Sequence, residues 1–398
     1  MRTPVHAGIA GRPHPIHGFA LFALGFRPFY LLAALTAAIS LPVWVAQFFG
    51  VLPVAGFVTG ITWHTHEMVF GFAVAVITGF LFTAVRSWTG LATPSGGTLA
   101  ALAGLWLLGR IAMLTGPGWF AAIADVAFLP AIAWYLWQPL QRTRSRNRFL
   151  VAIVATLAVI NLLFHLAHSG ILALYPVTLM QVGLMLVLVL VAIMGGRVIP
   201  AFTRNAVRSA RVRSVKGLDA CALASLIAAL LSWLAGLPEW LVAVLALAAA
   251  VVNALRLWSW DPWATRAQPI LWILHLSYAW IPLGLVVLAL AVTGVAGSTA
   301  LAMHAFGVGA IGGMIIGMMT RTARGHTGRA LHVCDIEVVA YGFVHLAALM
   351  RVVLPLVWPQ AYTAALVGSA AFWSVAFALY CIVYWPVLAR PRIDGKPG

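Results

Sequence analysis

Charged residues are scarce in this sequence. Asp and Glu number only 8 in 398 residues, Lys and Arg number 24, and charged residues make up 8% of the chain. A soluble globular domain carries about 25% charged residues, so this composition excludes a water-soluble domain of any size. Hydrophobic residues make up 63% of the chain, so its natural solvent is lipid. We therefore expect an integral membrane protein.

Cysteine is also rare. The three residues Cys221, Cys334 and Cys381 lie far apart and show no CxxC spacing. Neither a disulfide framework nor a thiolate metal site is predicted. The net charge of +16 would suit a nucleic-acid partner, but the basic residues occupy short breaks between apolar runs. In that position Lys and Arg act as topology signals, so no nucleic-acid partner is expected.

Long apolar runs fill nearly all of the chain. A helix needs about 20 apolar residues to cross the hydrocarbon core of a bilayer, so about twelve crossings are expected. The predicted fold is an all-α polytopic membrane protein, a single membrane domain over residues 1–398. A weak seam at residues 201–216 separates two six-helix halves. The expected spans are residues 25–48, 62–86, 98–115, 119–138, 149–168, 176–200, 217–235, 238–258, 268–292, 299–319, 336–354 and 362–386.

The distribution of Lys and Arg predicts the orientation in the membrane. Basic residues near the ends of spans are retained on the cytoplasmic side. Every second connection is basic here, and the other connections hold almost no Lys or Arg. We therefore expect a multi-pass protein of the bacterial cytoplasmic (inner) membrane, with the N- and C-termini in the cytoplasm. The basic residues on that side are Arg2, Arg12, Arg86, Arg142, Arg144, Arg146, Arg148, Arg204, Arg208, Arg211, Arg213, Lys216, Arg256, Arg266, Arg321, Arg324, Arg329, Arg390, Arg392 and Lys396.

Histidines outnumber carboxylates, at 12 against 8. Ionisable residues inside a bilayer are costly, and they mark functional sites by default. Six histidines from four spans share the periplasmic half of the membrane, whereas His275 lies near the cytoplasmic side. The six are His64, His66, His165, His168, His304 and His345. Because imidazole is the usual ligand of haem iron, copper and zinc, this cluster predicts at least one metal or haem site. The expected solvated histidines are His6, His14, His17 and His332.

Helical geometry divides the clustered histidines further. Residues three apart share a helix face, whereas residues two apart point nearly opposite ways. His165 and His168 are therefore expected to share one site. In the second span, His64 is expected to pair with Glu67, and His66 to face a different neighbour. Two adjacent sites would result.

Arginine side chains within spans and at span ends support further predictions. Arg110 in the third span and Asp125 in the fourth lie at matching depth, which predicts a structural ion pair. Arg27 and Arg197 lie at span ends, where an arginine either snorkels to the interface or binds a haem propionate. The glycines of GVGAIGGMIIGMMTR, in the tenth span, predict a face for close helix packing.

Several strings together resemble the NnrS family of bacterial haem- and copper-containing membrane proteins linked to nitric oxide stress. The resemblance spans nearly the whole chain, and the most specific string is the last one. The strings are GFRPFYLLAAL at 25–35, WHTHEMVFGFAVAVITGFLFTAV at 63–85, WTG at 88–90, GGRVIPAFT at 195–203, LHLSYAWIPLGL at 274–285 and MMTRTARGHTGRAL at 318–331.

This resemblance implies a twelve-span protein that carries haem and copper. His64, His66 and Glu67 match the HxHEM signature, while His304 and His326 match the HAxGVGA and GHTGR signatures. The predicted topology places His326 in a cytoplasmic connection, a membrane thickness away from the other histidines. There it either folds back into the protein or joins His275 in contacting a metal or a propionate. His165, His168 and His345 lie outside the matched strings, so their role rests on depth alone.

The implied function is binding of nitric oxide, with reduction to nitrous oxide as the enzymatic form of that activity. Reduction would need a separate electron donor and a proton source. Glu67, expected as the only carboxylate beside the histidines, is the predicted catalytic residue for proton transfer. The alternatives are a twelve-span secondary transporter and a non-catalytic protein that handles nitric oxide or metal.

Overall fold

A computed structural model describes residues 18–53 and 56–396 of the chain. The N-terminal residues for which the sequence makes predictions, Arg2, His6, Arg12, His14 and His17, lie outside the described residues. Within the described ranges there is no strand, and 12 helices are long and apolar enough to cross a membrane. The predicted all-α membrane fold with about twelve spans is therefore confirmed.

Six of the spans are single helices: α1 (Phe26–Phe48), α4 (Gly96–Thr115), α8 (Pro176–Ala206), α9 (Lys216–Leu234), α10 (Glu239–Trp258) and α11 (Pro269–Val292). The others combine two or three elements: α2 (Gly60–His66), η1 (Glu67–Ala73) and α3 (Val74–Thr89); α5 (Gly118–Val126) and α6 (Phe128–Arg142); η2 (Arg146–Arg148) and α7 (Phe149–His168); α12 (Thr299–His304), η4 (Ala305–Gly312) and α13 (Gly313–His326); α14 (Asp335–Ala348), η5 (Leu349–Val353) and α15 (Leu354–Val357); η6 (Pro359–Ala361) and α16 (Tyr362–Ala389). A short 3₁₀ helix, η3 (Pro262–Thr265), lies in the connection before α11.

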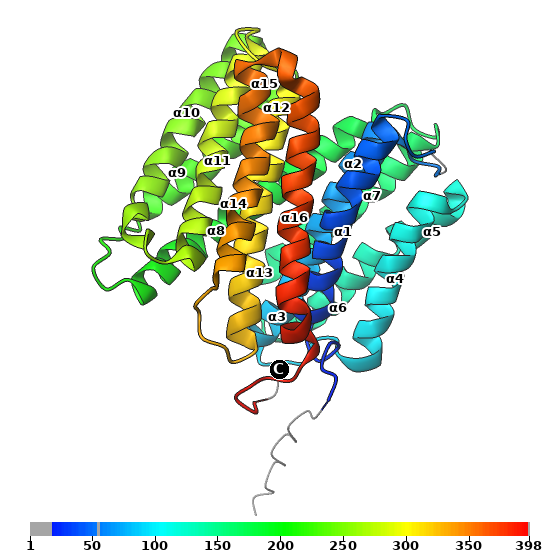
Figure 1. Ribbon diagram of the computed structural model, residues 1–398, viewed down its shortest axis with the longest axis vertical. Helices are drawn as coiled ribbons and strands as arrows, with labels where there is room; N and C mark the ends of the chain where they lie inside the picture. The colour runs from blue at the N-terminus through cyan, green and yellow to red at the C-terminus, as the bar shows by residue number, and fades with distance from the viewer. Residues whose placement is uncertain (1–17, 54–55, 397–398) are drawn as a thin grey trace, which may run out of the picture.

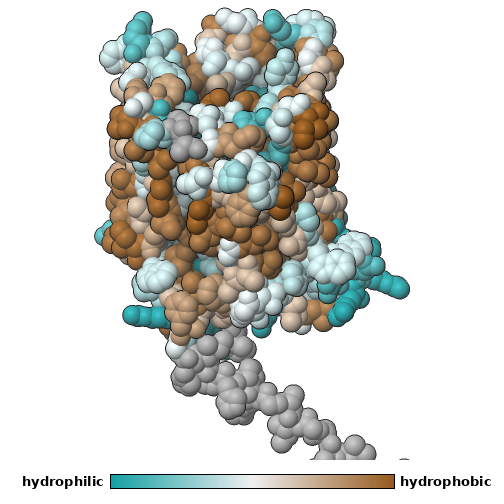
Figure 2. All heavy atoms as spheres, turned by 90° about the vertical axis from the view of Figure 1, so that its right-hand side faces the viewer, coloured by the Kyte–Doolittle hydropathy of each residue, from teal (hydrophilic) through white to brown (hydrophobic). Residues whose placement is uncertain are grey.

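The first and last spans lie side by side in the bundle (Figure 1). The backbone N–H of Ala20 donates to the carbonyl of Ala389 at 2.8 Å, so both ends of the described chain lie at one face, here called the terminal face. On the side seen in Figure 2, hydrophobic side chains dominate the middle, and strongly hydrophilic ones gather mostly toward the two ends. This distribution fits a bundle that is surrounded by lipid at its middle.

Two spans extend six or seven residues beyond their predicted ends. The sixth span was expected to end at residue 200 and the tenth at residue 319, but α8 continues to Ala206 and α13 to His326. Hydropathy marks where a chain leaves the lipid, whereas backbone hydrogen bonds continue through residues that favour helix, such as Arg and Ala. The placement of His326 in a connection is therefore wrong, because it is the last residue of α13.

Three spans contain a π-helical segment: η1 in the second, η4 in the tenth and η5 in the eleventh. A π segment widens the helix locally and is frequently found at functional sites. Each segment directly follows or contains a residue with an ionisable side chain, namely His66 before η1, His304 before η4 and Arg351 within η5. The region where these three spans meet is therefore a candidate functional site.

The predicted small-residue face of the tenth span is confirmed. A Cβ at Gly309 would overlap the indole ring of Trp280, and one at Gly312 would overlap the ring of Trp373. Because glycine has no side chain, two neighbouring helices can place large aromatic rings directly against this backbone.

Gly309→Ala is expected to lower stability, although alanine is normally the better helix residue by about 0.5–1 kcal/mol. The added methyl group must displace Trp280, and overpacking of this kind costs about 1–3 kcal/mol. Thermal unfolding in detergent would measure the change. The matched control is Gly104→Ala, since nothing lies within 4 Å of a Cβ at that position. Equal stability of the two variants would contradict the packing role of Gly309.

Candidate functional site

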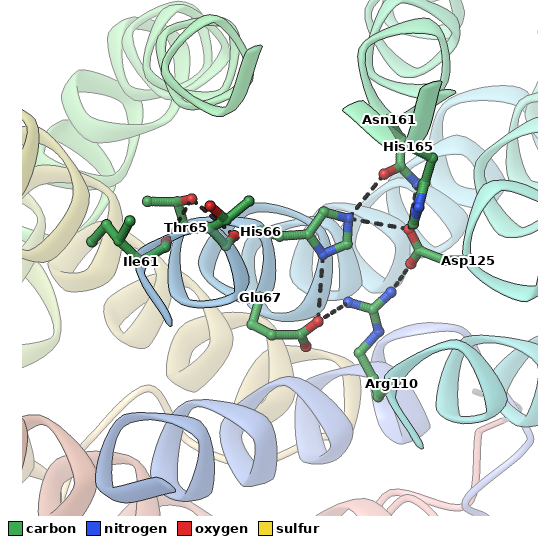
Figure 3. Close-up of polar contacts among 9 residues, drawn as sticks. Ile61, Thr65, His66, Glu67, Arg110, Asp125, Asn161 and His165 are labelled. Carbon is green, nitrogen blue, oxygen red and sulfur yellow. Dashed lines mark hydrogen bonds and ion pairs between the residues drawn. The ribbon is translucent and has the colours of Figure 1, made fainter. Parts of the chain in front are cut away.

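Six polar side chains meet inside the bundle, in what we call the carboxylate–histidine cluster (Figure 3). They come from four spans, and all are buried. The members are His66 from α2, Glu67 from η1, Arg110 from α4, Asp125 from α5, and Asn161 and His165 from α7. A polar group in such surroundings is stable only when its hydrogen-bonding and charge requirements are met within the cluster.

Arg110 joins the two carboxylates of the cluster. Its Nη1 donates to Glu67 Oε1 at 2.8 Å, and its Nη2 is paired with Asp125 Oδ1. The predicted ion pair between Arg110 and Asp125 is thus confirmed. The expectation that Glu67 is the only carboxylate beside the histidines is wrong, because Asp125 Oδ2 lies 3.1 Å from the Nε2 of His66.

Both ring nitrogens of His66 face acceptor atoms. Its Nδ1 lies 3.4 Å from Glu67 Oε1, and its Nε2 lies 3.0 Å from the side-chain oxygen of Asn161. The predicted pairing of His64 with Glu67 is therefore wrong. The prediction assumed a regular helix, but the span widens into η1 at Glu67, whose side chain reaches sideways to Arg110. Gly71, one turn later, leaves the room for this carboxylate, since a Cβ there would lie 2.6 Å from Glu67 Oε2.

Three atoms of the cluster are placed as metal ligands would be. His66 Nε2, Asp125 Oδ2 and His165 Nε2 come from three spans and lie within 4.8 Å of one another. Two imidazoles and one carboxylate suit copper, zinc or iron. Asn161 Nδ2 donates to Asp125 Oδ2 at 2.7 Å, which fixes the carboxylate from outside. The cluster therefore could hold one metal ion.

A second site lies on the other side of the second span. Here His64 and His304 line an apolar cavity of about 1210 Å³, a volume that includes its open part. All three π segments contribute to its wall. Trp44 stacks on His64, with ring centroids 4.4 Å apart. The His64 and His304 rings are nearly parallel, at 12°, but their centroids lie 6.3 Å apart, which exceeds direct stacking. We call this site the His64–His304 cavity.

The two remaining histidines of the predicted periplasmic group lie outside both sites. His168 Nε2 contacts the carbonyl of Phe57 at 3.0 Å, so His168 and His165 use different partners despite sharing a helix face. Trp280 Nε1 donates to His345 Nδ1 at 3.1 Å. Neither His168 nor His345 belongs to the candidate metal-ligand set or to the wall of the cavity.

The four residues predicted to contact a cofactor near the cytoplasm are dispersed. His275 Nε2 lies 2.9 Å from Thr203 Oγ1, and His326 packs against Phe26 at the terminal face. Arg197 is exposed, and its Nη1 donates to Asn147 Oδ1 at 3.2 Å.

Arg27 is fully buried, and its Nη1 donates to the carbonyls of Leu388 and Arg390 at the end of α16. These hydrogen bonds connect the first span to the end of the last span. Neither arginine predicted as a propionate ligand, Arg27 or Arg197, lines the His64–His304 cavity.

Several site residues were missed from the sequence, although two carried a signal. Asn161 lies four residues before His165, so a helix places both side chains on one face. Arg351 interrupts an apolar run near the end of the predicted span 336–354, and an ionisable residue inside a span marks function by default. The aromatic partner Trp44 carried no such signal, because tryptophan is common throughout this chain.

Together, the fold and the two sites define a polytopic membrane protein with buried imidazole and carboxylate groups that could bind metal. A family model described as NnrS protein matches residues 20–392, nearly the whole chain. The chain therefore belongs to the NnrS family. No curated protein matches it.

Arg110→Met is expected to destabilise the protein by about 3–5 kcal/mol, since it leaves two buried carboxylates without their cation. Adding Asp125→Asn to Arg110→Met should recover part of this loss, because one uncompensated charge is removed. Chemical unfolding in detergent would measure both variants. Arg142→Met serves as a control at an exposed position. If Arg110→Met were no more harmful than Arg142→Met, the charge network would not stabilise the fold.

Proposed function

We propose that this protein is a haem- and copper-containing protein of the bacterial cytoplasmic membrane that binds nitric oxide and reduces it. The family supports this proposal, and one structural observation carries it: two facing imidazoles and three π-helical segments converge on one apolar cavity. The terminal face, where many of the basic residues lie, would be the cytoplasmic face.

The His64–His304 cavity has the donor atoms and the apolar wall that a haem requires. His304 Nδ1 lies 2.6 Å from the carbonyl of Ala300, so Nδ1 carries the proton and Nε2 keeps a free lone pair. The buried Nδ1 of His64 has no hydrogen-bond partner in the part of the chain that the structure describes. Most of the residues that line the cavity are apolar, as the flat apolar faces of a porphyrin require. His64 and His304 would therefore hold the haem.

The carboxylate–histidine cluster would hold copper. Its candidate ligands are His66, His165 and Asp125, and the hydrogen bond from Asn161 to Asp125 would orient the carboxylate. When bound, haem iron supplies a binding site for nitric oxide, and copper supplies one-electron redox chemistry.

The protein's own residues would control how nitric oxide and protons reach the haem and the copper. Nitric oxide is small and uncharged, so it can enter an apolar cavity without losing strong hydrogen bonds. Reduction of two nitric oxide molecules to nitrous oxide and water consumes two electrons, from a separate donor, and two protons. Glu67 is buried beside His66 and Arg110, and it would hold and pass a proton in this half of the bundle.

Substituting the histidines one at a time should distinguish the proposed haem site from the proposed copper site. His64→Ala or His304→Ala is expected to remove most of the Soret absorbance of purified protein while copper remains. His66→Ala is expected to lower copper content while haem remains, because His66 faces away from the cavity. Absorbance spectra and metal analysis of the same samples would measure both.

Two histidines outside the sites provide controls for this experiment. His332→Ala alters an exposed histidine, and His168→Ala alters the neighbour of His165 that contacts the Phe57 carbonyl. Loss of haem from the His332 variant, or wild-type protein that binds neither haem nor copper, would contradict the proposed function.

Glu67→Gln is expected to lower sustained nitrous oxide production by roughly 10²-fold, the usual effect of losing a general acid or base. Glutamine still offers an oxygen to Arg110, so haem and copper content should persist. Glu239→Gln, at an exposed helix start, is the matched control. Unchanged turnover would remove Glu67 from the proton route. Consumption that stops after one equivalent, even in wild type, would indicate binding without catalysis.

A further inference from the structure

Among the described residues, Arg351 is the one Lys or Arg in the wall of the His64–His304 cavity. It projects from η5 and is only 7% exposed. Its guanidinium carbon lies 5.3 Å from the ring centroid of Tyr362, and its Nη2 donates to the Tyr362 hydroxyl at 3.5 Å, a long hydrogen bond. Its Nη1 is buried and has no hydrogen-bond partner within residues 18–53 and 56–396. The guanidinium therefore retains an unsatisfied donor at the cavity.

No carboxylate side chain of the protein neutralises Arg351. Five of the eight are paired with other arginines: Glu67 and Asp125 with Arg110, Asp219 with Arg256, Glu337 with Arg324, and Asp394 with Arg392. Asp261 accepts from the backbone N–H of Arg211, while Glu239 and Asp335 are exposed in the first turns of α10 and α14. The residues lining the cavity include no acid.

Two other arginines buried inside the bundle, Arg110 and Arg256, are paired with carboxylates. Arg110 has two carboxylates, and Arg256 has Asp219 together with the Tyr278 hydroxyl. A buried cation without a counter-charge is costly in a membrane span, and such residues pair with an anion or mark a ligand pathway. The missing negative charge at Arg351 must therefore be supplied from outside the chain.

We propose that Arg351 binds an anionic, carboxylate-type group of the ligand in the His64–His304 cavity. The planar guanidinium fork matches two oxygens of such a group. Two sources share this chemistry: a propionate of the haem, or a free oxyanion such as nitrite. The first source rests on the proposed function, and it would move the propionate contact expected of Arg27 or Arg197 to Arg351.

The test compares ligands as well as variants. Purified protein depleted of haem would be titrated with haem b and with haem b dimethyl ester, which lacks the negative charges, and the Soret band would be followed. Wild type should bind haem b about 10- to 100-fold more tightly than the ester. Arg351→Gln should lose this preference, Arg351→Lys should keep part of it, and Arg142→Gln should keep all of it.

The ligand comparison within wild type needs no variant, so a poorly folding Arg351→Gln cannot obscure the result. Equal affinity of wild type for haem b and its ester would exclude the propionate as the bound anion. Sodium nitrite then tests the second source: thermal stabilisation of wild type by nitrite that is smaller in Arg351→Lys would support a free-oxyanion site. Absence of both effects overturns the Arg351 proposal. Failure of wild type to bind either haem would instead refute the haem assignment, with nitrite still deciding the role of Arg351.

Discussion

The pairing of Arg110 with Glu67 and Asp125 is the interaction on which the rest of the structure depends. It joins the second, third and fourth spans inside an apolar bundle, where an unpaired charge would cost several kcal/mol. It also fixes the Glu67 and Asp125 carboxylates that contact His66. Without this bridge, neither the orientation of His66 nor the metal-type geometry with His165 would follow from helix packing alone.

The sequence was sufficient to predict the architecture because one physical rule dominates it. A run of about 20 apolar residues must cross the bilayer as a helix, so counting such runs gives the twelve spans. Helix ends were harder to predict, since α13 continues through polar residues to His326. Leaving the lipid ends the apolar pattern but does not break backbone hydrogen bonds.

The site was predicted only in part, for geometric reasons. Depth along each span correctly suggested that His64, His66 and His304 lie in the same half of the bundle. Helical angles failed at Glu67, because the π segment that begins there is not encoded in a hydrophobic pattern. Side-chain contacts between different spans could not be predicted from the sequence either, because depth does not determine which spans are neighbours. The pair of Arg110 with Asp125 is the exception. Without relative rotations, the sequence could not bring Asp125 to His66.

The two sites are joined by the short segment between His64 and His66. These residues lie on opposite sides of one helix, so each site has a histidine on the same rigid element. A unit charge ~10 Å away at an effective dielectric constant of ~20 contributes roughly 1.7 kcal/mol, more than a tenfold change in an equilibrium constant. A change of charge in the carboxylate–histidine cluster would thus alter anion and electron affinity in the cavity. Arg351 places a fixed positive charge on the cavity side, whereas Arg110 is already neutralised by its two carboxylates. The arrangement therefore favours negative charge in the cavity and positive charge, as a proton or metal ion, in the cluster.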